Sequence, residues 1–212
     1  MQFNPTLGFW LNKPNAFSIS ENQLEITTEA NTDFWQRTYY GFRNDNAPAL
    51  QIELADNFTF TAKVSFDYKK LFDQCGLIIY LDENNWFKAA IEYENATFSR
   101  LGSVVTNQGY SDWATQDIQL PEEIWYRLSR RGPDFLAEFS LDGKVYQQLR
   151  IFHLHALGET TPDMGNQDPP LAPKKPVPFG LYACSPTESS FTARFSEFSL
   201  SECQWRSHPA EV

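Results

Sequence analysis

Apolar and polar residues alternate along most of this chain, and runs with helical spacing are nearly absent. The segment 58–66 alternates over its whole length, which predicts a strand with one buried face. Alternation or a short apolar run predicts further strands over 23–28, 34–42, 50–54, 75–81, 86–92, 98–106, 124–130, 135–141, 179–184 and 191–200. Many short strands at regular spacing indicate a β-sandwich or barrel, so we expect an all-β fold.

Turn signals separate these strands. Asp142-Gly143 predicts a tight hairpin between 139–141 and 144–146. The segment 82–85 is expected to join the apolar strand before it to the strand that begins at Trp86. The segment 109–113 is interpreted as a polar and aromatic loop.

The segment 156–178 breaks the pattern because it holds six prolines. This density argues against a central strand or a helix, since proline lacks the N–H that both need. Long loops of this kind are surface excursions or lids over a binding face, and the sequence leaves both readings open. We expect one domain over 1–205, with 156–178 as an insertion in it and 206–212 as a tail.

The strand that begins at Trp86 separates into two faces, because residues two apart lie on the same side. Phe87, Ala89, Ile91 and Tyr93 form an apolar face that should enter the core. The opposite face carries Trp86, Lys88, Ala90 and Glu92. Its aromatic and charged side chains suit a ligand groove, although a solvated face with an ordinary ion pair has the same composition.

The preceding strand is apolar on both faces, so we expect it to be central in one of two stacked sheets. Its Gly76 removes a side chain in mid-strand, which marks close approach of a ligand or of another backbone. Similar aromatic and polar residues recur in 34–42 and 109–113. The residues that we expect to bind a ligand are Trp35, Arg37, Tyr39, Gln74, Tyr80, Trp86, Lys88, Glu92, Asp112 and Trp113.

Charge and cysteine content narrow the class of protein. The chain has 212 residues and a formal net charge of −10, which argues against nucleic acid or an anionic membrane as a partner. Cys75, Cys184 and Cys203 form neither a disulfide framework nor a zinc-binding pattern. No secretory signal or membrane span is visible, so we expect a cytoplasmic protein. We also expect no metal and no cofactor.

Several ordered motifs resemble one known family. They are Asp33-Phe34-Trp35-Gln36-Arg37-Thr38, Asp73-Gln74-Cys75-Gly76-Leu77, the run from Leu81 to Ala89, Ile91-Glu92-Tyr93, Ser103-Val104-Val105-Thr106 and Tyr110-Ser111-Asp112-Trp113. Together they resemble the DUF1349 family over about residues 5 to 200. That family includes the fungal "regulation of enolase" proteins. The resemblance implies a two-sheet antiparallel jelly-roll sandwich with the concanavalin A-like lectin/glucanase fold and one concave face.

Three functions follow as alternatives. The first is a binding module that holds a carbohydrate or an anionic sugar derivative on the concave face, linked to regulation of sugar metabolism. The second is a carbohydrate-active enzyme, a hydrolase or lyase, that uses Glu92 with help from Lys88 or Tyr80. Glu94 could supply a second carboxyl, but the E-x-D-x-E pattern of laminarinase-like enzymes is absent. The third is a regulator that binds a protein partner and no small molecule. We favour the first and lean against catalysis.

Overall fold

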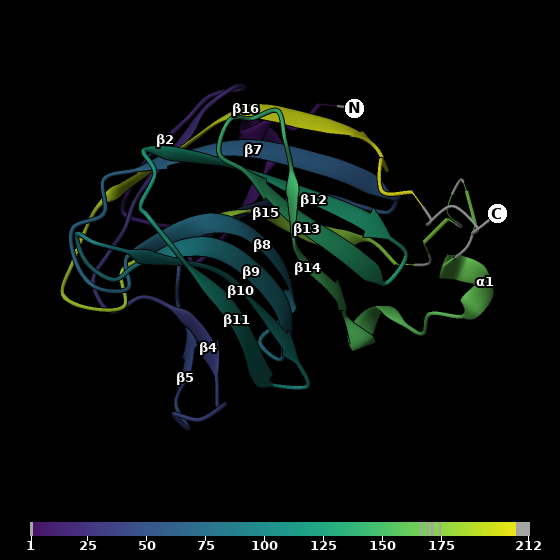
Figure 1. Ribbon diagram of the computed structural model, residues 1–212, viewed down its shortest axis with the longest axis horizontal. Helices are drawn as coiled ribbons and strands as arrows, with labels where there is room; N and C mark the ends of the chain where they lie inside the picture. The colour runs from purple at the N-terminus through teal and green to yellow at the C-terminus, as the bar shows by residue number, and fades with distance from the viewer. Residues whose placement is uncertain (1, 166, 169, 171, 174, 207–212) are drawn as a thin grey trace.

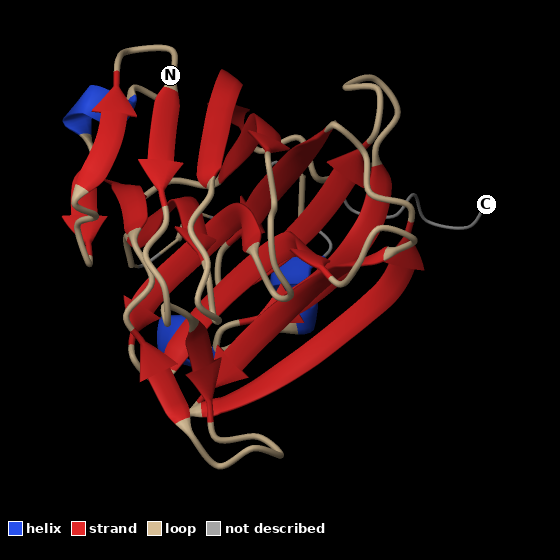
Figure 2. Cartoon of the chain, turned by 90° about the vertical axis from the view of Figure 1, so that its left-hand side faces the viewer, coloured by secondary structure: helices blue, strands red, loops and turns tan. Residues whose placement is uncertain are grey.

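The computed structural model describes residues 2–165, 167–168, 170, 172–173 and 175–206. Two seven-stranded antiparallel sheets stack face to face, and short helical segments add little to them (Figures 1 and 2). In spatial order the first sheet contains β1 (Phe9–Leu11), β6 (Ala49–Leu54), β15 (Val177–Cys184), β8 (Gln74–Asp82), β9 (Asn85–Tyr93), β10 (Ser99–Asn107) and β11 (Tyr110–Ile118). The expected all-β, concanavalin A-like sandwich is confirmed.

The second sheet covers one face of the first. In spatial order it contains β14 (Gln147–His153), β13 (Asp134–Ser140), β12 (Glu123–Arg131), β7 (Phe58–Phe66), β16 (Thr192–Glu202), β3 (Leu24–Thr27) and β2 (Ala16–Ile19). A separate hairpin of β4 (Phe34–Gln36) and β5 (Arg43–Asp45) lies against the other face of the first sheet (Figure 1). The remaining elements are the short helices η1 (Pro5–Leu7), η2 (His155–Leu157) and α1 (Pro162–Gly165).

The main core fills the space between the sheets, as the alternation predicts. Phe58 and Phe60 of β7 are fully buried and pack on Phe179 of β15, with ring centroids 4.0 and 5.4 Å apart. Phe87 of β9 stacks on Phe152 of β14 at 4.0 Å. Each aromatic side chain buries about 150–250 Å², so these contacts contribute strongly to the stability of the core. The same alternation turns Lys88 and Glu92 away from this core.

The expected strand over 34–42 is wrong after Gln36. Arg37 and Tyr39 have φ values of 56° and 62°, and Gly41 has 77°. These left-handed residues reverse the chain, and β5 returns beside β4 with the N–H of Arg37 donating to the carbonyl of Phe42 at 2.9 Å. The aromatic residues that suggested a strand here belong to a tight turn.

Two other expected turns also differ from the structure. The expected loop 109–113 is mostly strand, because β11 begins at Tyr110; it is an edge strand with exposed residues on both faces, so its polar composition hid it. The hairpin at Asp142 is longer than expected, and β14 begins only at Gln147. There the Asp142 carboxylate accepts the N–H groups of Lys144 and Val145 at 2.8 and 2.9 Å.

The exclusion of helix and strand from 156–178 is wrong at two places. Helix α1 begins at Pro162, which is tolerated because the first N–H groups of a helix have no intrahelical partner. Strand β15 includes Pro178, which pairs with Glu53 of β6, whereas the ladder to β8 begins one residue later at Phe179. Proline there interrupts no bond to β8.

No helix in the described part of the chain is long and apolar enough to cross a membrane. Cys75, Cys184 and Cys203 are all buried and form no disulfide.

Gly76 marks a close approach of backbone, one of the two readings that its position allowed. A Cβ at this position would collide with the carbonyl oxygen of Ala89 on β9. We therefore expect Gly76→Ala to lower the free energy of unfolding by about 1–3 kcal/mol, because β8 and β9 would have to separate. Urea denaturation measures this. Gly158→Ala is the control, since its methyl would meet nothing within 4 Å and it reports backbone strain (φ 119°) alone. An equal loss in both variants would contradict the collision.

Candidate functional site

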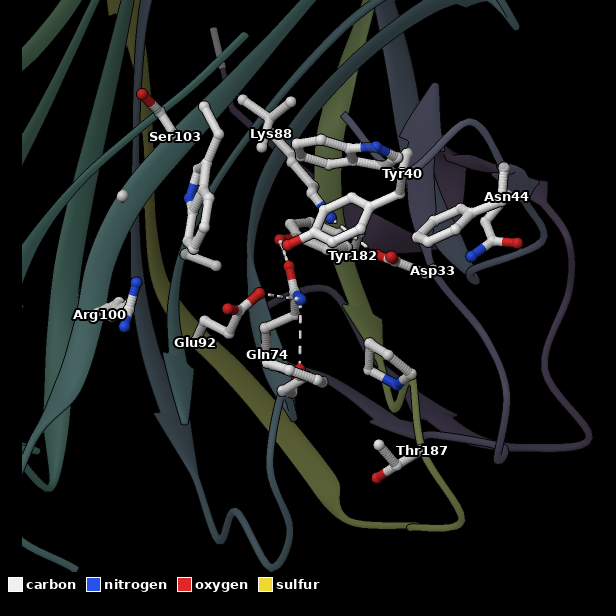
Figure 3. Close-up of a pocket in the computed structure, with 18 residues that line it drawn as sticks. Asp33, Tyr40, Asn44, Gln74, Lys88, Glu92, Arg100, Ser103, Tyr182 and Thr187 are labelled. Atoms are coloured by element: carbon white, nitrogen blue, oxygen red, sulfur yellow. Dashed lines mark hydrogen bonds and ion pairs between the residues drawn. The ribbon is translucent and has the colours of Figure 1, made fainter. Parts of the chain in front are cut away.

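A cavity of about 370 Å³ opens on the face of the first sheet that points away from the core (Figure 3). We call it the inner cavity. Residues of β8, β9, β10, β11 and β15 form its floor, and the β4–β5 hairpin and two loops form its walls. The lining residues are Asp33, Trp35, Tyr40, Phe42, Asn44, Phe72, Gln74, Lys88, Ala90, Glu92, Arg100, Gly102, Ser103, Val104, Trp113, Tyr182, Pro186 and Thr187.

The β4–β5 hairpin makes the inner cavity by packing onto the sheet through a second, smaller core. Phe34 is fully buried between Trp86 and Tyr182, with ring centroids 5.9 and 6.1 Å apart. The N–H of Gln36 donates to the hydroxyl of Ser111 on β11 at 2.9 Å. The hairpin is therefore fixed both over the centre of the sheet and at its edge.

A buried ion pair lies at the base of the inner cavity. The Lys88 ammonium is 2.9 Å from Oδ1 of Asp33, and both side chains are largely buried (6% and 14% exposed). Burial alone would lower the pKa of Lys88, but the Asp33 carboxylate together with Cys184 and Glu92 outweighs it, so the pKa is raised and the lysine stays charged. Two charges buried together at this distance stabilise each other, whereas either one alone would be costly.

Glu92 is held by a chain of hydrogen bonds (Figure 3). Burial raises the pKa of Tyr182, so its hydroxyl is protonated and donates to Oε1 of Gln74 at 2.9 Å. Nε2 of Gln74 then donates to the carbonyl of Phe72 at 3.2 Å and to Oε2 of Glu92 at 3.0 Å. The amide of Gln74 uses both of its N–H donors in these contacts, so its main effect is to orient Glu92.

The second oxygen of Glu92, Oε1, makes no hydrogen bond within the described part of the chain. Burial raises the pKa of this carboxyl to about 7, against the opposing effect of Lys88; Asp33 and Glu94 raise it further, and Arg100 lowers it. Glu92 can therefore hold or release a proton near neutral pH. Arg100 forms its ion pair with Glu94, whose Oε1 lies 2.7 Å from its Nε, and its guanidinium lies 5.7 Å from the ring centre of Trp113.

Five of the ten expected ligand-binding residues meet at the inner cavity. They are Trp35, Gln74, Lys88, Glu92 and Trp113. Strand β9 carries both Lys88 and Glu92 and turns their side chains toward the inner cavity, as the face assignment predicts.

The other five do not line the inner cavity. Trp86 is fully buried beneath Phe34 and cannot serve as an exposed platform. Tyr80 donates to Asp45 at 2.7 Å, so it cannot assist Glu92, and Arg37 donates to the carbonyl of Gly109 at 2.8 Å. Tyr39 and Asp112 line a neighbouring cavity instead.

Sequence reasoning missed several residues that line the inner cavity, although the sequence pattern could have identified some of them. Arg100 lies directly opposite Glu92 in the β9–β10 ladder, so the register of that hairpin would have found it. Tyr182 could have been predicted from alternation along β15: Leu181 enters the core, so the next residue points to the opposite face of the sheet. Asn44, Tyr40 and Phe42 had no signal, because they reach the inner cavity only through the unexpected turn after Gln36.

The paired-carboxyl reading of Glu92 and Glu94 finds no support in this geometry. Strand β9 ends at Tyr93, and Glu94 pairs with Arg100 and does not line the inner cavity. The other lining carboxylate, Asp33, is neutralised by Lys88. No group of three or more His, Cys, Asp or Glu side chains suited to a metal is found among the described residues. The described residues of 156–178 do not line the inner cavity either, and α1 lies on the opposite side of the molecule from the hairpin (Figure 1).

A two-sheet antiparallel sandwich with a hollowed outer face and a separate hairpin over it defines a concanavalin A-like β-sandwich protein. Over residues 10–203 the sequence matches the family described as "Protein of unknown function (DUF1349)", and the chain belongs to that family.

Known proteins resemble the chain over most of its length. It is 30% identical over 194 residues to Regulation of enolase protein 1 of Saccharomyces cerevisiae, covering 91% of this chain and 88% of that protein. The crystal structure of a functionally unknown protein from S. cerevisiae superposes with a TM-score of 0.81 and 28% identity, covering 96% of this chain and 100% of the other. The GH43 BlXynB protein from Bacillus licheniformis has a TM-score of 0.63 and 16% identity; 89% of this chain matches 35% of it, which shows the fold alone.

The buried ion pair gives a stability prediction. Lys88→Met leaves the Asp33 carboxylate buried without its cation, so we expect a loss of about 3–5 kcal/mol in the free energy of unfolding. Adding Asp33→Asn should restore part of that loss. The control is Lys69→Met, whose partner Asp67 is exposed and 3.8 Å away; it should change stability by less than about 1 kcal/mol. Urea denaturation compares the four proteins, and equal effects of Lys88→Met and Lys69→Met would contradict the burial argument.

The raised pKa of Glu92 gives a pH prediction. The carboxyl of Glu92 has a pKa near 7 in the folded state and 4.5 in the unfolded state. Its ionisation therefore lowers the free energy of unfolding at pH values above 4.5. This destabilisation is absent below about pH 4.5, grows as the pH rises toward 7 and reaches its full size above pH 7. We expect Glu92→Gln to stabilise the protein by about 1–3 kcal/mol at pH 8 and by much less at pH 4.5. The exposed Glu53→Gln is the control; a Glu92→Gln effect that does not vary with pH would refute this.

Proposed function

We propose that this protein is a binding module that holds a carbohydrate in the inner cavity. The observation that carries the proposal is the combination of aromatic walls with polar groups that have no protein partner. Trp35, Tyr40, Phe42 and Trp113 supply flat apolar surfaces. A sugar ring has an apolar face and a rim of hydroxyl groups, and small-molecule sites of this kind combine apolar walls with a few placed polar groups.

Several polar residues line the inner cavity where a sugar's hydroxyl groups would lie, among them Ser103, whose buried hydroxyl makes no hydrogen bond within the described part of the chain. Oε1 of Glu92 and the side-chain amide of Asn44 both face the inner cavity and make no hydrogen bond within the described part of the chain (Figure 3). The carboxylate accepts hydrogen bonds from hydroxyl groups, and the amide can both donate and accept. Because Gln74 fixes the orientation of Glu92 before any ligand arrives, little side-chain ordering is needed on binding.

The charge balance favours a neutral sugar. The expectation of an anionic derivative relied on Lys88 and Arg37, but Lys88 is paired with Asp33, and Arg37 lies outside the inner cavity. Arg100 is paired with Glu94, so Glu92 is left without a partner of opposite charge in direct contact. A uronate or a sugar phosphate would meet that carboxylate, and the two cations that line the inner cavity, Lys88 and Arg100, are each already paired with a carboxylate.

A second candidate is a regulator of sugar metabolism that binds a protein. The name of the yeast relative, Regulation of enolase protein 1, supports this, and so do exposed aromatic residues such as Tyr39 (93% exposed) and Tyr110 (62% exposed). We infer a cytoplasmic location for either candidate, because three free, buried thiols suit a reducing compartment.

A thermal-shift screen tests the first candidate. The probes are glucose, xylose, galactose and mannose, with glucuronate and glucose 6-phosphate for comparison. A sugar at 100 times its dissociation constant stabilises the fold by about 2.7 kcal/mol, which is measurable. We expect a neutral sugar to bind more tightly at pH 8 than at pH 5.5, because the ionised Glu92 accepts a charge-assisted hydrogen bond from a sugar hydroxyl and protonation of the carboxyl weakens that bond.

Glu92→Gln should weaken this binding at pH 8 and abolish its pH dependence, whereas Glu53→Gln should leave both unchanged. Lys88→Ala is a poor test of the site, because it also disrupts the buried ion pair. Failure of all six probes, and also of cellobiose and xylobiose, at millimolar concentration would refute the carbohydrate proposal and favour the protein-binding candidate. Affinity capture with the wild-type chain and a Tyr39→Ala variant would then examine that candidate.

A further inference from the structure

A second cavity of about 410 Å³ adjoins the inner one, and we call it the outer cavity. The two share three aromatic side chains, Trp35, Tyr40 and Trp113. These rings come from the β4–β5 hairpin and from the edge strand β11. The shared rings therefore form a boundary that both cavities contact, and the two cavities are neighbouring parts of one face of the molecule.

The strained turn of the hairpin distributes its aromatic residues between the two cavities. Tyr39, at φ 62°, lines only the outer cavity, whereas Phe42 lines only the inner one. Tyr40 lies between them, with its ring centroid 4.9 Å from that of Tyr39 and 5.3 Å from that of Phe42. A non-glycine residue in the left-handed region is unfavourable, and such residues concentrate at functional sites.

The turn is held in place from outside. Nη1 of Arg37 donates to the carbonyl of Gly109 at 2.8 Å, and its guanidinium lies 5.4 Å from the ring centre of Tyr110. Nε1 of Trp35 donates to the carbonyl of Thr38 at 3.1 Å. The rings at the boundary are thus fixed before a ligand binds.

The sizes and polar groups suit one sugar ring in each cavity. Both volumes lie at the lower end of the range of about 300–1,000 Å³ for small-molecule sites, so neither alone encloses a long ligand. The inner cavity has Glu92 and Asn44. The outer cavity has Tyr39 and Asp112. The side chain of Asp112 is 72% exposed, and within the described part of the chain its carboxylate contacts Arg150 alone, at 3.1 Å.

We propose that the two cavities are consecutive subsites for a neutral oligosaccharide of at least two rings, with the second ring in the outer cavity against Tyr39 and Trp113. This rests on the proposed carbohydrate-binding function and deepens it. The terminal ring occupies the inner cavity beside Glu92, and the glycosidic linkage passes Tyr40. A monosaccharide fills only the inner subsite.

Isothermal titration of the full chain tests this with two series of β-1,4-linked sugars: glucose, cellobiose and cellotriose, and xylose, xylobiose and xylotriose. We expect affinity to rise about tenfold from one ring to two in the series that binds, which is the size of one good aromatic contact. Tyr39→Ala should remove most of that gain and leave monosaccharide affinity within about twofold. Asp112→Ala should act in the same direction.

The control is Phe9→Ala, which alters an exposed aromatic residue on β1, outside both cavities. It should change no affinity. If disaccharide and monosaccharide bind equally well, the two-subsite proposal is wrong while carbohydrate binding stands. A gain with length that survives both Tyr39→Ala and Asp112→Ala also overturns it, because the second ring then lies elsewhere. Absence of binding by every sugar in both series overturns this proposal together with the proposed function.

Discussion

The ion pair between Lys88 and Asp33 is the interaction on which the hollowed face depends. Lys88 is on a central strand of the first sheet, with its side chain directed away from the core, and Asp33 lies just before the β4–β5 hairpin. A buried ammonium needs a counter-charge, so the sheet can carry Lys88 only if the hairpin supplies one. Phe34, the next residue, then enters the small core against Trp86. The ion pair of Lys88 with Asp33 and the contact of Phe34 with Trp86 together hold the β4–β5 hairpin over the sheet.

The same pairing determines the electrostatic character of the inner cavity. Lys88 is neutralised by Asp33, and Arg100 by Glu94, which leaves Glu92 as the carboxyl that meets a ligand. Its raised pKa follows from that arrangement, because burial disfavours its charge and the nearby lysine only partly offsets the effect. Gln74 and Tyr182 hold it in one orientation. The site is therefore an acceptor near a neutral ion pair, which suits recognition of hydroxyl groups better than recognition of anions.

The sequence pattern predicted the strands in which buried and exposed residues alternate regularly. The alternation in 58–66 matches β7, and the two faces of β9 follow from residues two apart. The sequence pattern failed where contacts between segments far apart in the sequence determine the local structure or the burial of a residue. Trp86 has the same periodicity as an exposed platform would, but Phe34 covers it, and no local pattern reveals that cover. Edge strand β11 has polar residues on both faces, so it resembled a loop. The turn at Arg37 and Tyr39 requires left-handed conformations that neither residue prefers.

That turn is the clearest conflict between local preference and the observed structure. Arg37 and Tyr39 each occupy a conformation that costs about 1–2 kcal/mol, and glycine would adopt it freely at either position. Stability alone would favour such a replacement. The side chains present instead make contacts that glycine would lose: Arg37 ties the hairpin to the turn at Gly109, and Tyr39 presents a ring to the outer cavity. The conformational cost is accepted at two positions that Thr38 separates. Arg37 lines neither cavity and holds the hairpin in place, whereas Tyr39 is 93% exposed and presents its ring to the outer cavity. The cost at Tyr39 is therefore better explained by what the outer cavity binds than by folding.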